Sequence, residues 1–324
     1  MHNLHTLTPF TLMFFLTACV QSTSVKQAQV KPRVFPPPPA TTQACDQVHA
    51  KNQQAFDLYQ QGQHEAAQRL LETAIQNCPR DAKSHNNLAD IIQTKGDDDK
   101  AMIHYRQAVA LNPNLSEAWH GLGEIYYQQG RFPLSLEAHL HACQTDADSK
   151  QRVTALLKDN RYAVTEAGDI LDKESLLLLY DKQRRQAIND MISACGLRGL
   201  SRIDEPVATF RNFQFNSGKA NLEYGSERQL DEIAAALQEL PNQTIKIYGH
   251  TDTQPFPNTT PSESKRRNQE LSLARANSVA QKLSSRGVAH YRLKTEGFGQ
   301  EKPLVRGNNP AAWAKNRRVE IEVD

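Results

Sequence analysis

The feature that most constrains this chain is a repeat with a period of 34 residues between Val48 and Ser149. Gly62, Gly96 and Gly130 follow one another at this spacing. Small residues recur at the same period: Ala55, Ala89 and Gly123; Ala67, Ala101 and Ser135; and Ala74, Ala108 and Ala142. Small residues are expected where two helices approach closely, so each repeat is predicted to be a pair of antiparallel helices.

This pattern resembles the tetratricopeptide repeat and covers residues 45–149 in three copies. In that family the first helix of each repeat lines a concave surface that binds peptides or partner proteins. The resemblance places these side chains on that surface: Asn52, Phe56, Tyr59, Asn86, Asp90, Gln93, His120, Glu124 and Tyr127. The candidates for binding an unknown protein partner are Asn52, Asn86, Asp90, His120 and Tyr127. The alternative is an array that serves only as a spacer.

The third copy departs most from the pattern. It has His139 where the second copy has Tyr105, and Ala147 replaces the proline that closes the first two copies. We therefore expect it to rest on the segment that follows. Residues 150–204 are predicted to be a helical connector, in which Lys173 to Cys195 forms one amphipathic helix.

Beyond Glu205 the pattern changes from helical to alternating. A first strand is predicted to begin at Phe213 and Phe215, and two more are predicted at Thr244–Tyr248 and Arg317–Val323. One helix is predicted after a capping box of Ser226 and Gln229, and another is predicted to end at Gly287. Strands that alternate with helices indicate a two-layer α/β sandwich. The predicted fold class is therefore multidomain, with an all-α tetratricopeptide superhelix followed by this sandwich.

Four separated motifs of residues 205–324 resemble OmpA-like peptidoglycan-binding domains, and they occur in the order seen in that family. They are Gly249 to Asp252 (GHTD), Asn268 to Ala276 (NQELSLARA), Gly297 to Gly299 (GFG) with Pro303, and Asn316 to Glu320 (NRRVE). The resemblance implies a ligand, the diaminopimelate side group of the peptidoglycan stem peptide. It further implies that Asp252 receives the ammonium of that group and Arg275 its carboxylate, while Asn268 and Arg318 line the pocket.

The residues themselves fit such a ligand. A helix turns 100° per residue, so Asn268 and Arg275 lie on nearly the same line of one helix. Asp252 follows a strand at the loop that leads toward this helix. A carboxylate and a guanidinium that converge on one cleft form a receptor for a zwitterion.

Two departures from the family concern the rim of this cleft. The segment from Thr253 to Arg267 is predicted to be a long loop, as in the MotB-like branch, which also has a proline where this chain has Pro255. Gly218 stands where relatives offer an asparagine after the first strand. One polar contact to the ligand is therefore expected to be missing.

The amino terminus has the shape of a lipoprotein signal peptide over residues 1–18. The short apolar stretch Leu7 to Leu16 is about half the length of a membrane span, and Leu16 to Cys19 resembles a bacterial lipobox. The resemblance implies that Cys19 is lipidated, with palmitate-like acyl chains, and that it anchors the protein at the periplasmic face of the outer membrane. Residues 19–44 are predicted to be a flexible, proline-rich linker. The alternative is an uncleaved apolar tail.

The remaining cysteines allow disulfides without proving them. Cys45 with Cys78 and Cys143 with Cys195 are the candidate pairs. His139, His141 and Cys143 lie close together in the sequence, but only His139 and Cys143 share a helical face. No metal site is therefore predicted.

Composition excludes several classes of function. The 38 Lys and Arg residues nearly balance the 36 Asp and Glu residues, so nucleic acid is not expected as a partner. No nucleophile or metal-helix motif appears, so no catalytic residue, enzyme activity or cofactor is predicted. The sequence predicts an outer-membrane lipoprotein that binds peptidoglycan and recruits a protein partner. The alternative is an assembly factor of a secretion, motility or surface-polysaccharide system positioned at the wall.

Overall fold

The computed structural model describes residues 45–324 except for 167, 198–202, 204, 214, 216–217 and 223. The predicted signal peptide, Cys19 and the proline-rich linker lie outside the described residues. The described residues belong to one compact unit. Among the helices that the structure describes, none is both long enough and apolar enough to cross a membrane.

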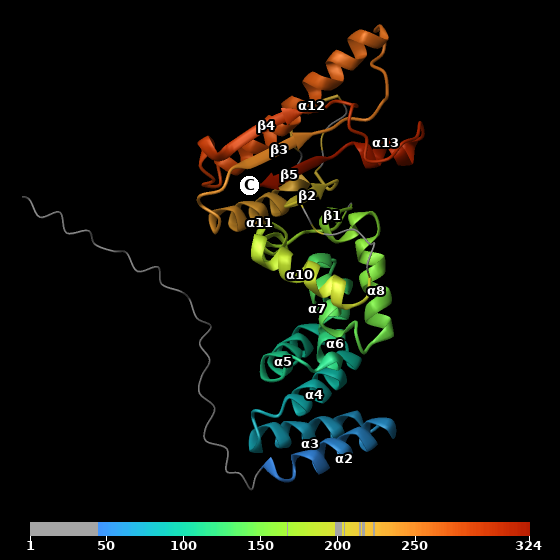
Figure 1. The fold of residues 1–324 in the computed structure, drawn as a ribbon, viewed down its shortest axis with the longest axis vertical. Coiled ribbons are helices and arrows are strands. Elements are labelled where there is room, and N and C mark those ends of the chain that lie inside the picture. The colour runs from blue at the N-terminus through green and yellow to red at the C-terminus, as the bar shows by residue number, and fades with distance from the viewer. Residues whose placement is uncertain are drawn as a thin grey trace, which may run out of the picture. The chain divides into compact units, whose positions relative to one another are not determined.

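Three helical hairpins make up the amino-terminal part of this unit (Figure 1). Their helices are α2 (Val48–Gln60) and α3 (His64–Asn77), α4 (Ala82–Thr94) and α5 (Asp98–Leu111), and α6 (Ser116–Gln128) and α7 (Phe132–Ala142). The glycines of the 34-residue period lie in the turns and have φ values of 74°, 82° and 72° for Gly62, Gly96 and Gly130. Only glycine adopts this left-handed conformation without strain. The predicted tetratricopeptide array is therefore confirmed.

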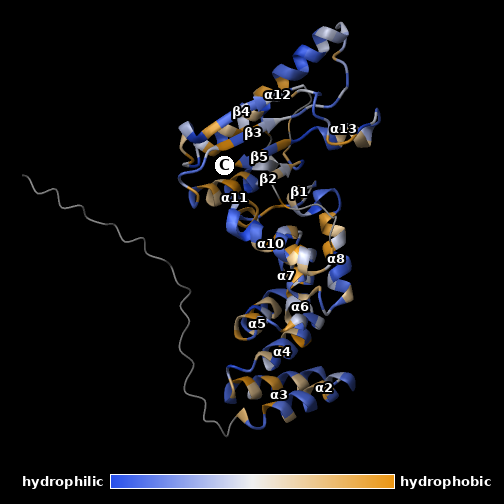
Figure 2. Ribbon diagram, viewed as in Figure 1, coloured by the Kyte–Doolittle hydropathy of each residue, from blue (hydrophilic) through white to orange (hydrophobic). Residues whose placement is uncertain are grey.

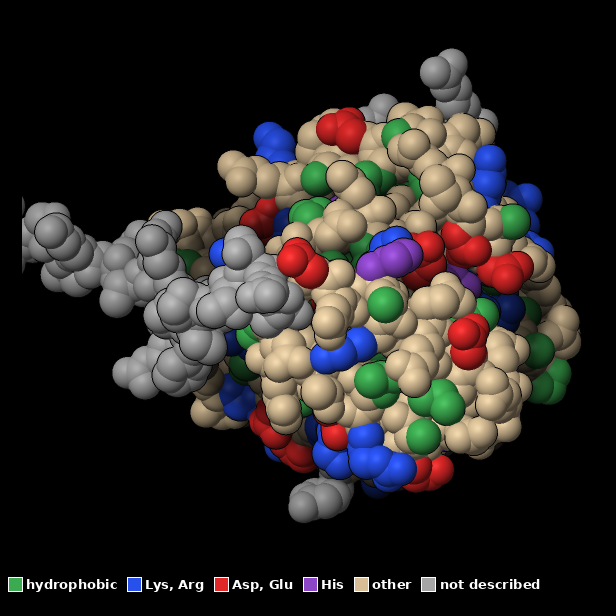
Figure 3. Space-filling model, turned by 90° about the horizontal axis from the view of Figure 1, so that it is seen from below, with side chains coloured by type: hydrophobic (Ala, Val, Ile, Leu, Met, Phe, Trp, Pro, Cys, Tyr) green, Lys and Arg blue, Asp and Glu red, His purple; other side chains and the backbone are tan. Residues whose placement is uncertain are grey.

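Small residues hold the helices of each hairpin close together. Ala67, Ala89 and Ala101 are fully buried, as are Ala108 and Ala142. Hydrophobic and hydrophilic residues are interspersed along these helices (Figure 2), and the buried ones include Leu71 of α3, Leu88 of α4 and Leu122 of α6. On the face seen in Figure 3, hydrophobic side chains occur in small separate groups among charged and polar ones. The visible surface is thus of mixed character, without one broad apolar patch.

The third repeat packs against the next helix, α8 (Ala147–Leu157), as its weaker pattern led us to expect. Asp146 caps α8 by accepting a hydrogen bond from the backbone N–H of Ser149 at 2.7 Å. His139 is fully buried, and its Nδ1 lies 2.9 Å from Oγ of Ser149. α8 therefore covers the end of the array and supplies a polar partner to the buried histidine.

The prediction of one helix from Lys173 to Cys195 is wrong. The segment forms α9 (Lys173–Tyr180) and α10 (Lys182–Ala194), which meet at Asp181. Asp181 has an extended backbone with ψ of 117°, and its side chain accepts a hydrogen bond from the N–H of Arg184. An aspartate at this position satisfies an otherwise unpaired donor of the new helix, so the chain turns there.

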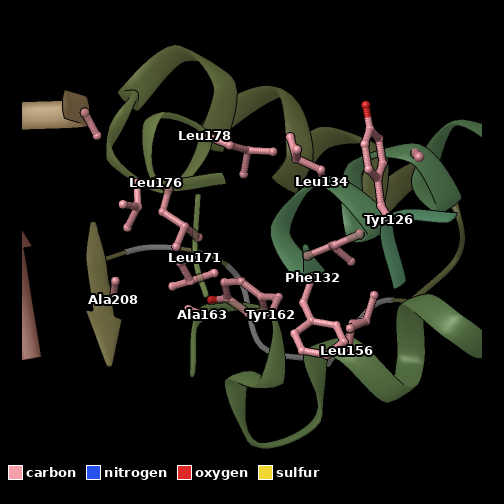
Figure 4. Packing of buried hydrophobic residues seen from close by; sticks show 14 of the residues in the cluster. Tyr126, Phe132, Leu134, Leu156, Tyr162, Ala163, Leu171, Leu176, Leu178 and Ala208 are labelled. Carbon is pink, nitrogen blue, oxygen red and sulfur yellow. The ribbon is translucent and has the colours of Figure 1, made fainter. Parts of the chain in front are cut away.

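The connector also joins the carboxy-terminal sheet, which the sequence did not predict. After the 3-10 turn η1 (Lys158–Ala163), strand β1 (Val164–Thr165) pairs in parallel with β2 (Val207–Phe210). Buried residues run without interruption from the third repeat through the connector to this sheet. Figure 4 shows this packing for Phe132, Leu134, Tyr162, Leu171 and Ala208, among others. The connector is therefore part of a shared core.

Five strands form the mixed sheet in the order β1-β2-β5-β3-β4. β3 (Ile245–Gly249) pairs in parallel with β4 (Leu293–Gly297) and antiparallel with β5 (Val319–Val323), while β2 pairs antiparallel with β5. The first strand of the domain ends at Phe210, so the prediction that it begins at Phe213 is wrong. Phe215 makes only an isolated bridge with Leu222.

Helices cover one face of this sheet. α11 (Glu227–Gln238) packs against α12 (Pro261–Ser284), and α12 lies on β3 and β4. Residues of β3 and β5 alternate between buried and half-buried, as a sheet with one covered face requires. The short elements η2 (Tyr224–Ser226), η3 (His290–Arg292) and α13 (Pro310–Asn316) complete the two-layer α/β sandwich that the sequence predicts.

The predicted capping box before α11 does not form. Ser226 makes no side-chain cap bond to the helix. Gln229 instead bonds the connector: its Oε1 accepts from the N–H of Leu171 at 3.1 Å and its Nε2 donates to the carbonyl of Leu171 at 2.9 Å. This residue therefore ties the connector to the sandwich.

Both candidate disulfides are present. Cys45 and Cys78 join the start of the first hairpin to its end, with Cα atoms 5.1 Å apart. Cys143 and Cys195 join the end of α7 to the end of α10, with Cα atoms 5.8 Å apart.

Candidate functional site

Two glycines set the position of the helix that carries half of the candidate site. A Cβ atom on Gly249 would lie 2.0 Å from the carbonyl oxygen of Ser272, and one on Gly297 would lie 2.4 Å from the backbone nitrogen of Leu273. α12 therefore packs directly on the backbone of β3 and β4. The hydroxyl of Ser272 accepts a hydrogen bond from the N–H of Gly299 at 2.8 Å, which fixes the next loop against the same helix.

Asp252 lies just beyond the end of β3 and faces this helix. Its Oδ1 accepts a hydrogen bond from the N–H of Gln254 at 2.9 Å. Its Oδ2 accepts one from Nη1 of Arg317 at 2.7 Å. The residue is 7% exposed. The carboxylate is thus held in a defined orientation at the edge of the sheet.

Arg275 points from α12 toward the same region and is 5% exposed. Its Nε donates to the carbonyl of Lys219 at 3.2 Å, and its guanidinium lies 4.9 Å from the ring centre of Phe215. Burial lowers the pKa of Arg275, the positive charge of Arg317 lowers it further, and Asp252 raises it. Arginine keeps its positive charge under such shifts of its pKa. The buried guanidinium of Arg275 can therefore bind an anionic group of a ligand.

A pocket of about 640 Å³ contains both groups. The residues that line it are Phe215, Gly218, Thr251, Asp252, Gln254, Pro255, Phe256, Pro257, Asn268, Leu271, Arg275 and Arg317. The structure thus brings together Asp252, Asn268 and Arg275, which belong to two separate sequence motifs. Gly218 forms part of the wall.

The assignment of Arg318 to this pocket is wrong. Its guanidinium donates to Oε1 of Glu320 at 2.7 Å and to the carbonyl of Lys302 at 3.1 Å, away from the pocket. Arg317 lines the pocket instead. Both arginines lie between α13 and β5, and successive side chains of an extended segment point to opposite sides. The arginine that lines the pocket is therefore the residue just before the predicted one.

The rim of the pocket differs from the predicted long loop. α12 begins at Pro261, and Oγ1 of Thr260 caps it by accepting from the N–H of Glu263, so the second half of the segment 253–267 is helical. Asn268 is buried, and its Nδ2 donates to Oε1 of Gln300 at 3.2 Å and lies 3.5 Å from the carbonyl of Gln254. Asn268 therefore supports the rim as well as lining the pocket.

The sequence reasoning missed Phe215 and Arg317. Phe215 lies outside the motifs, and no signal in the sequence placed it under Arg275. Arg317 is adjacent to the predicted Arg318, but the motif alone does not say which of the two arginines faces the helix layer. Taken together, the pocket offers one carboxylate and two guanidinium groups to a charged ligand.

The residues proposed for the repeat surface are distributed differently from the expectation. Asn52 is buried, and its Nδ2 donates to Oδ2 of Asp81 and Oγ of Ser84, both at 3.0 Å. Asn86 is also buried and donates to Oδ2 of Asp90 at 3.2 Å. Asn52 of α2 therefore bonds to α4 and to its cap residue Asp81, whereas the hydrogen bond from Asn86 to Asp90 lies within α4.

The other repeat residues lie nearer the surface. Asp90 and His120 line a cavity of about 500 Å³ together with Gln93, Tyr105, Ser116, Glu117, Gly121, Glu124, Gln128, Thr145 and Asp146. Nδ1 of His120 lies 2.8 Å from Oδ2 of Asp146. The ring of Tyr127 packs under the guanidinium of Arg152 at 3.7 Å. Within the described ranges, no group of three or more His, Cys, Asp or Glu side chains is arranged to hold a metal ion.

These features define a two-layer α/β domain with a charged pocket, attached through a shared core to an array of helical hairpins. The OmpA family model matches residues 214–317, and a TPR repeat model matches residues 90–130. The chain therefore belongs to the OmpA family and carries tetratricopeptide repeats.

Several relatives match part of the chain. The peptidoglycan-associated lipoprotein of Pasteurella multocida is 33% identical over 127 residues, which cover 39% of this chain and 79% of that protein. Outer membrane protein Omp38 of Acinetobacter baumannii is 38% identical over 106 residues, 32% of this chain. The chain spans only 28% of the length of Omp38 and 57% of that of a peptidoglycan-associated lipoprotein of Buchnera aphidicola. The crystal structure of the peptidoglycan-associated lipoprotein from Burkholderia pseudomallei aligns with a TM-score of 0.30 at 28% identity, covering 35% of this chain and 88% of that one.

Proposed function

We propose that this protein binds peptidoglycan non-covalently at the cell wall, through the diaminopimelate of the stem peptide. The observation that carries the proposal is the convergence of Asp252 and Arg275, both nearly buried, on one pocket. The relatives from Pasteurella and Buchnera are named peptidoglycan-associated lipoproteins, which supports peptidoglycan as the ligand. The proposed function is binding without catalysis.

The chemistry of the pocket fits the free end of diaminopimelate. This end carries an ammonium group and a carboxylate on one carbon atom. Asp252 would accept hydrogen bonds from the ammonium, and the two terminal nitrogens of Arg275 would donate to the carboxylate. Among the described residues, only the carbonyl of Lys219 accepts a hydrogen bond from Arg275, and it uses Nε, so the terminal nitrogens stay available. Because Asp252 and Arg275 are both nearly buried, such charge-assisted bonds are stronger there than on the surface.

Sedimentation with purified peptidoglycan tests this proposal. Asp252→Ala and Arg275→Ala are each expected to remain in the supernatant, whereas the wild-type protein pellets with the wall. Arg266→Ala is the matched control, because Arg266 lies on the same helix with its side chain 59% exposed and outside the pocket. Pelleting of either pocket variant at the wild-type level would refute the ligand assignment.

We further propose that Cys19 carries the lipid that anchors the protein at the periplasmic face of the outer membrane. The lipobox of the sequence supports this, as does the name "lipoprotein" of several relatives. The variant Cys19→Ser is expected to move from the membrane fraction to the soluble fraction. Unchanged pelleting with membranes would contradict lipid anchoring.

The repeats are proposed to recruit a protein partner to the wall. The cavity that Asp90 and Glu117 line supports this role, because the carboxylate of Glu117 is exposed there and lacks a salt bridge within the described residues. Asp90 lines the same cavity and accepts hydrogen bonds from Tyr105 and Asn86. In vivo crosslinking with Asp90→Asn and Glu117→Gln tests it, and an unchanged set of partners would favour a spacer. If that partner belongs to a secretion, motility or polysaccharide system, the protein is an accessory or assembly factor rather than a simple tether.

A further inference from the structure

The charges that face the pocket are uneven. Among the described residues that line it, Asp252 is the single acidic side chain, while Arg275 and Arg317 are both cationic. The proximity of the two cations is unfavourable, since the charge of Arg317 lowers the pKa of Arg275. The pocket therefore holds one more positive charge than negative charge.

Arg317 occupies the position on Asp252 that an ammonium group would take. Its Nη1 lies 2.7 Å from Oδ2 of Asp252, and the other carboxylate oxygen is already bonded by the N–H of Gln254. An incoming ammonium therefore has to share Oδ2 with Arg317 or displace it. The side chain of Arg317 is 44% exposed, in contrast to 10% for that of Asp252. Arg317 reaches in from the rim and has solvent into which it can move.

We propose that Arg317 is a third ligand-binding side chain and that it exchanges partners when the pocket is filled. It neutralises Asp252 in the empty pocket. When the ammonium of the ligand takes its place, Arg317 turns to a carboxylate of the ligand. This inference rests on the proposed function, because it assumes that the ligand is a zwitterion held by Asp252 and Arg275.

The charge balance defines the preferred class of ligand. A zwitterion alone is neutral and leaves the excess positive charge of the pocket uncompensated. A zwitterion with one further carboxylate carries a net negative charge and satisfies both arginines, which are suited to bidentate bonds with carboxylates. Diaminopimelate has this form when it is the last residue of a stem peptide, because its second carboxylate is then free. The pocket thus selects stem peptides that end at diaminopimelate.

Titration calorimetry of the full chain with two synthetic peptides tests the exchange. One is a stem tripeptide that ends in diaminopimelate with both carboxylates free, and the other carries an amide at the carboxylate of the peptide end. Both keep the zwitterion that Asp252 and Arg275 hold. The wild-type protein is expected to bind the free acid about tenfold more tightly, the effect of one charge-assisted hydrogen bond. Arg317→Ala is expected to bind the two peptides equally, and Arg317→Lys is expected to keep part of the preference.

The outcomes separate this inference from the proposed function. If Arg317→Ala keeps the full preference of the wild type, or if the wild type binds both peptides equally, the role of Arg317 is refuted while zwitterion binding stands. If the wild type binds neither peptide, the proposed function itself fails and the exchange fails with it. Arg275→Ala serves as the reference, since it is expected to lose both peptides. Thermal unfolding of each variant confirms that it is folded.

Discussion

Gly249 of β3 lies so close to Ser272 of α12 that a Cβ atom would stand 2.0 Å from the serine carbonyl oxygen. This contact brings the end of the strand, and hence Asp252, to the helix that carries Arg275. The pocket thus depends on direct contact between two backbones, for which only glycine leaves room.

Gly249→Ala is expected to lower the free energy of unfolding by about 1–3 kcal/mol, the usual cost of overpacking, and to weaken binding to peptidoglycan. Urea denaturation and sedimentation measure the two effects. Gly62→Ala is the control: a Cβ there meets no atom within 4 Å, but φ is 74°. Gly62→Ala is expected to lower the free energy of unfolding by about 1–2 kcal/mol and to leave binding to peptidoglycan unchanged. If Gly249→Ala and the wild type bind peptidoglycan equally, the pocket does not depend on the contact between Gly249 and Ser272.

The repeats, the sandwich and most of the pocket were predictable, because each follows from a strong local rule. Helix pairs that touch need small residues at fixed spacing, as at Ala67 and Ala101, and half-covered strands alternate, as in β5. Asp181 was not predictable as a break, since the apolar stripe continues through it and only the cap of α10 marks the turn. Arg317 was missed because its place depends on the register of β5, which the motif alone does not give.

Acidification is expected to destabilise the sandwich through Glu320. Burial raises the pKa of Glu320, but the imidazole of His250, whose Nε2 lies 3.3 Å from Oε2 of Glu320, and the charge of Arg318 outweigh it and lower the pKa to about 2. A carboxyl whose folded pKa is lowered contributes stability above its unfolded value, ordinarily 4.5, and this contribution is lost as the pH falls toward 2. Burial lowers the pKa of His250, so proton uptake by the unfolded state below about pH 6.5 acts in the same direction.

Urea denaturation between pH 7 and pH 3 measures this dependence. Glu320→Gln is expected to be less stable than the wild type at pH 7 and to lose less stability on acidification. Glu301→Gln is the control, because Glu301 is exposed and, among the residues that the structure describes, forms an ion pair only with the exposed Lys265. If the free energy of unfolding falls with pH by the same amount in Glu320→Gln and in the wild type, the role of Glu320 is contradicted.

Asn52 is expected to stabilise the array rather than to contact a partner. Asn52→Ala removes the bonds to Asp81 and Ser84 and leaves Nδ2 of Asn87 without its acceptor. The expected loss is about 1–3 kcal/mol of unfolding free energy, measured by urea denaturation. Gln53→Ala, at the neighbouring exposed position, is expected to change stability by less than about 0.5 kcal/mol. If both variants are equally stable, the buried network has no structural role.

The disulfide between Cys143 and Cys195 is expected to hold the connector to the third repeat. The double variant Cys143→Ala, Cys195→Ala is expected to lose about 2–4 kcal/mol of stability, as for other bridges that close loops of this size. Alkylation followed by mass measurement checks the bonds directly. Without reductant, none of Cys45, Cys78, Cys143 and Cys195 is expected to react, and with reductant all four are. Modification of these residues in the unreduced, unfolded protein would show that the bridges are absent.

The central claim is that Asp252 and Arg275 together hold an ammonium and a carboxylate on one carbon atom. Its most direct test is the affinity of the full chain for two stem peptides, one with diaminopimelate and one with lysine, which lacks only the carboxylate that Arg275 would bind. The wild-type protein is expected to bind the diaminopimelate peptide at least tenfold more tightly, and Arg275→Ala is expected to lose this preference. Equal affinity of the wild-type protein for the two peptides would contradict the account.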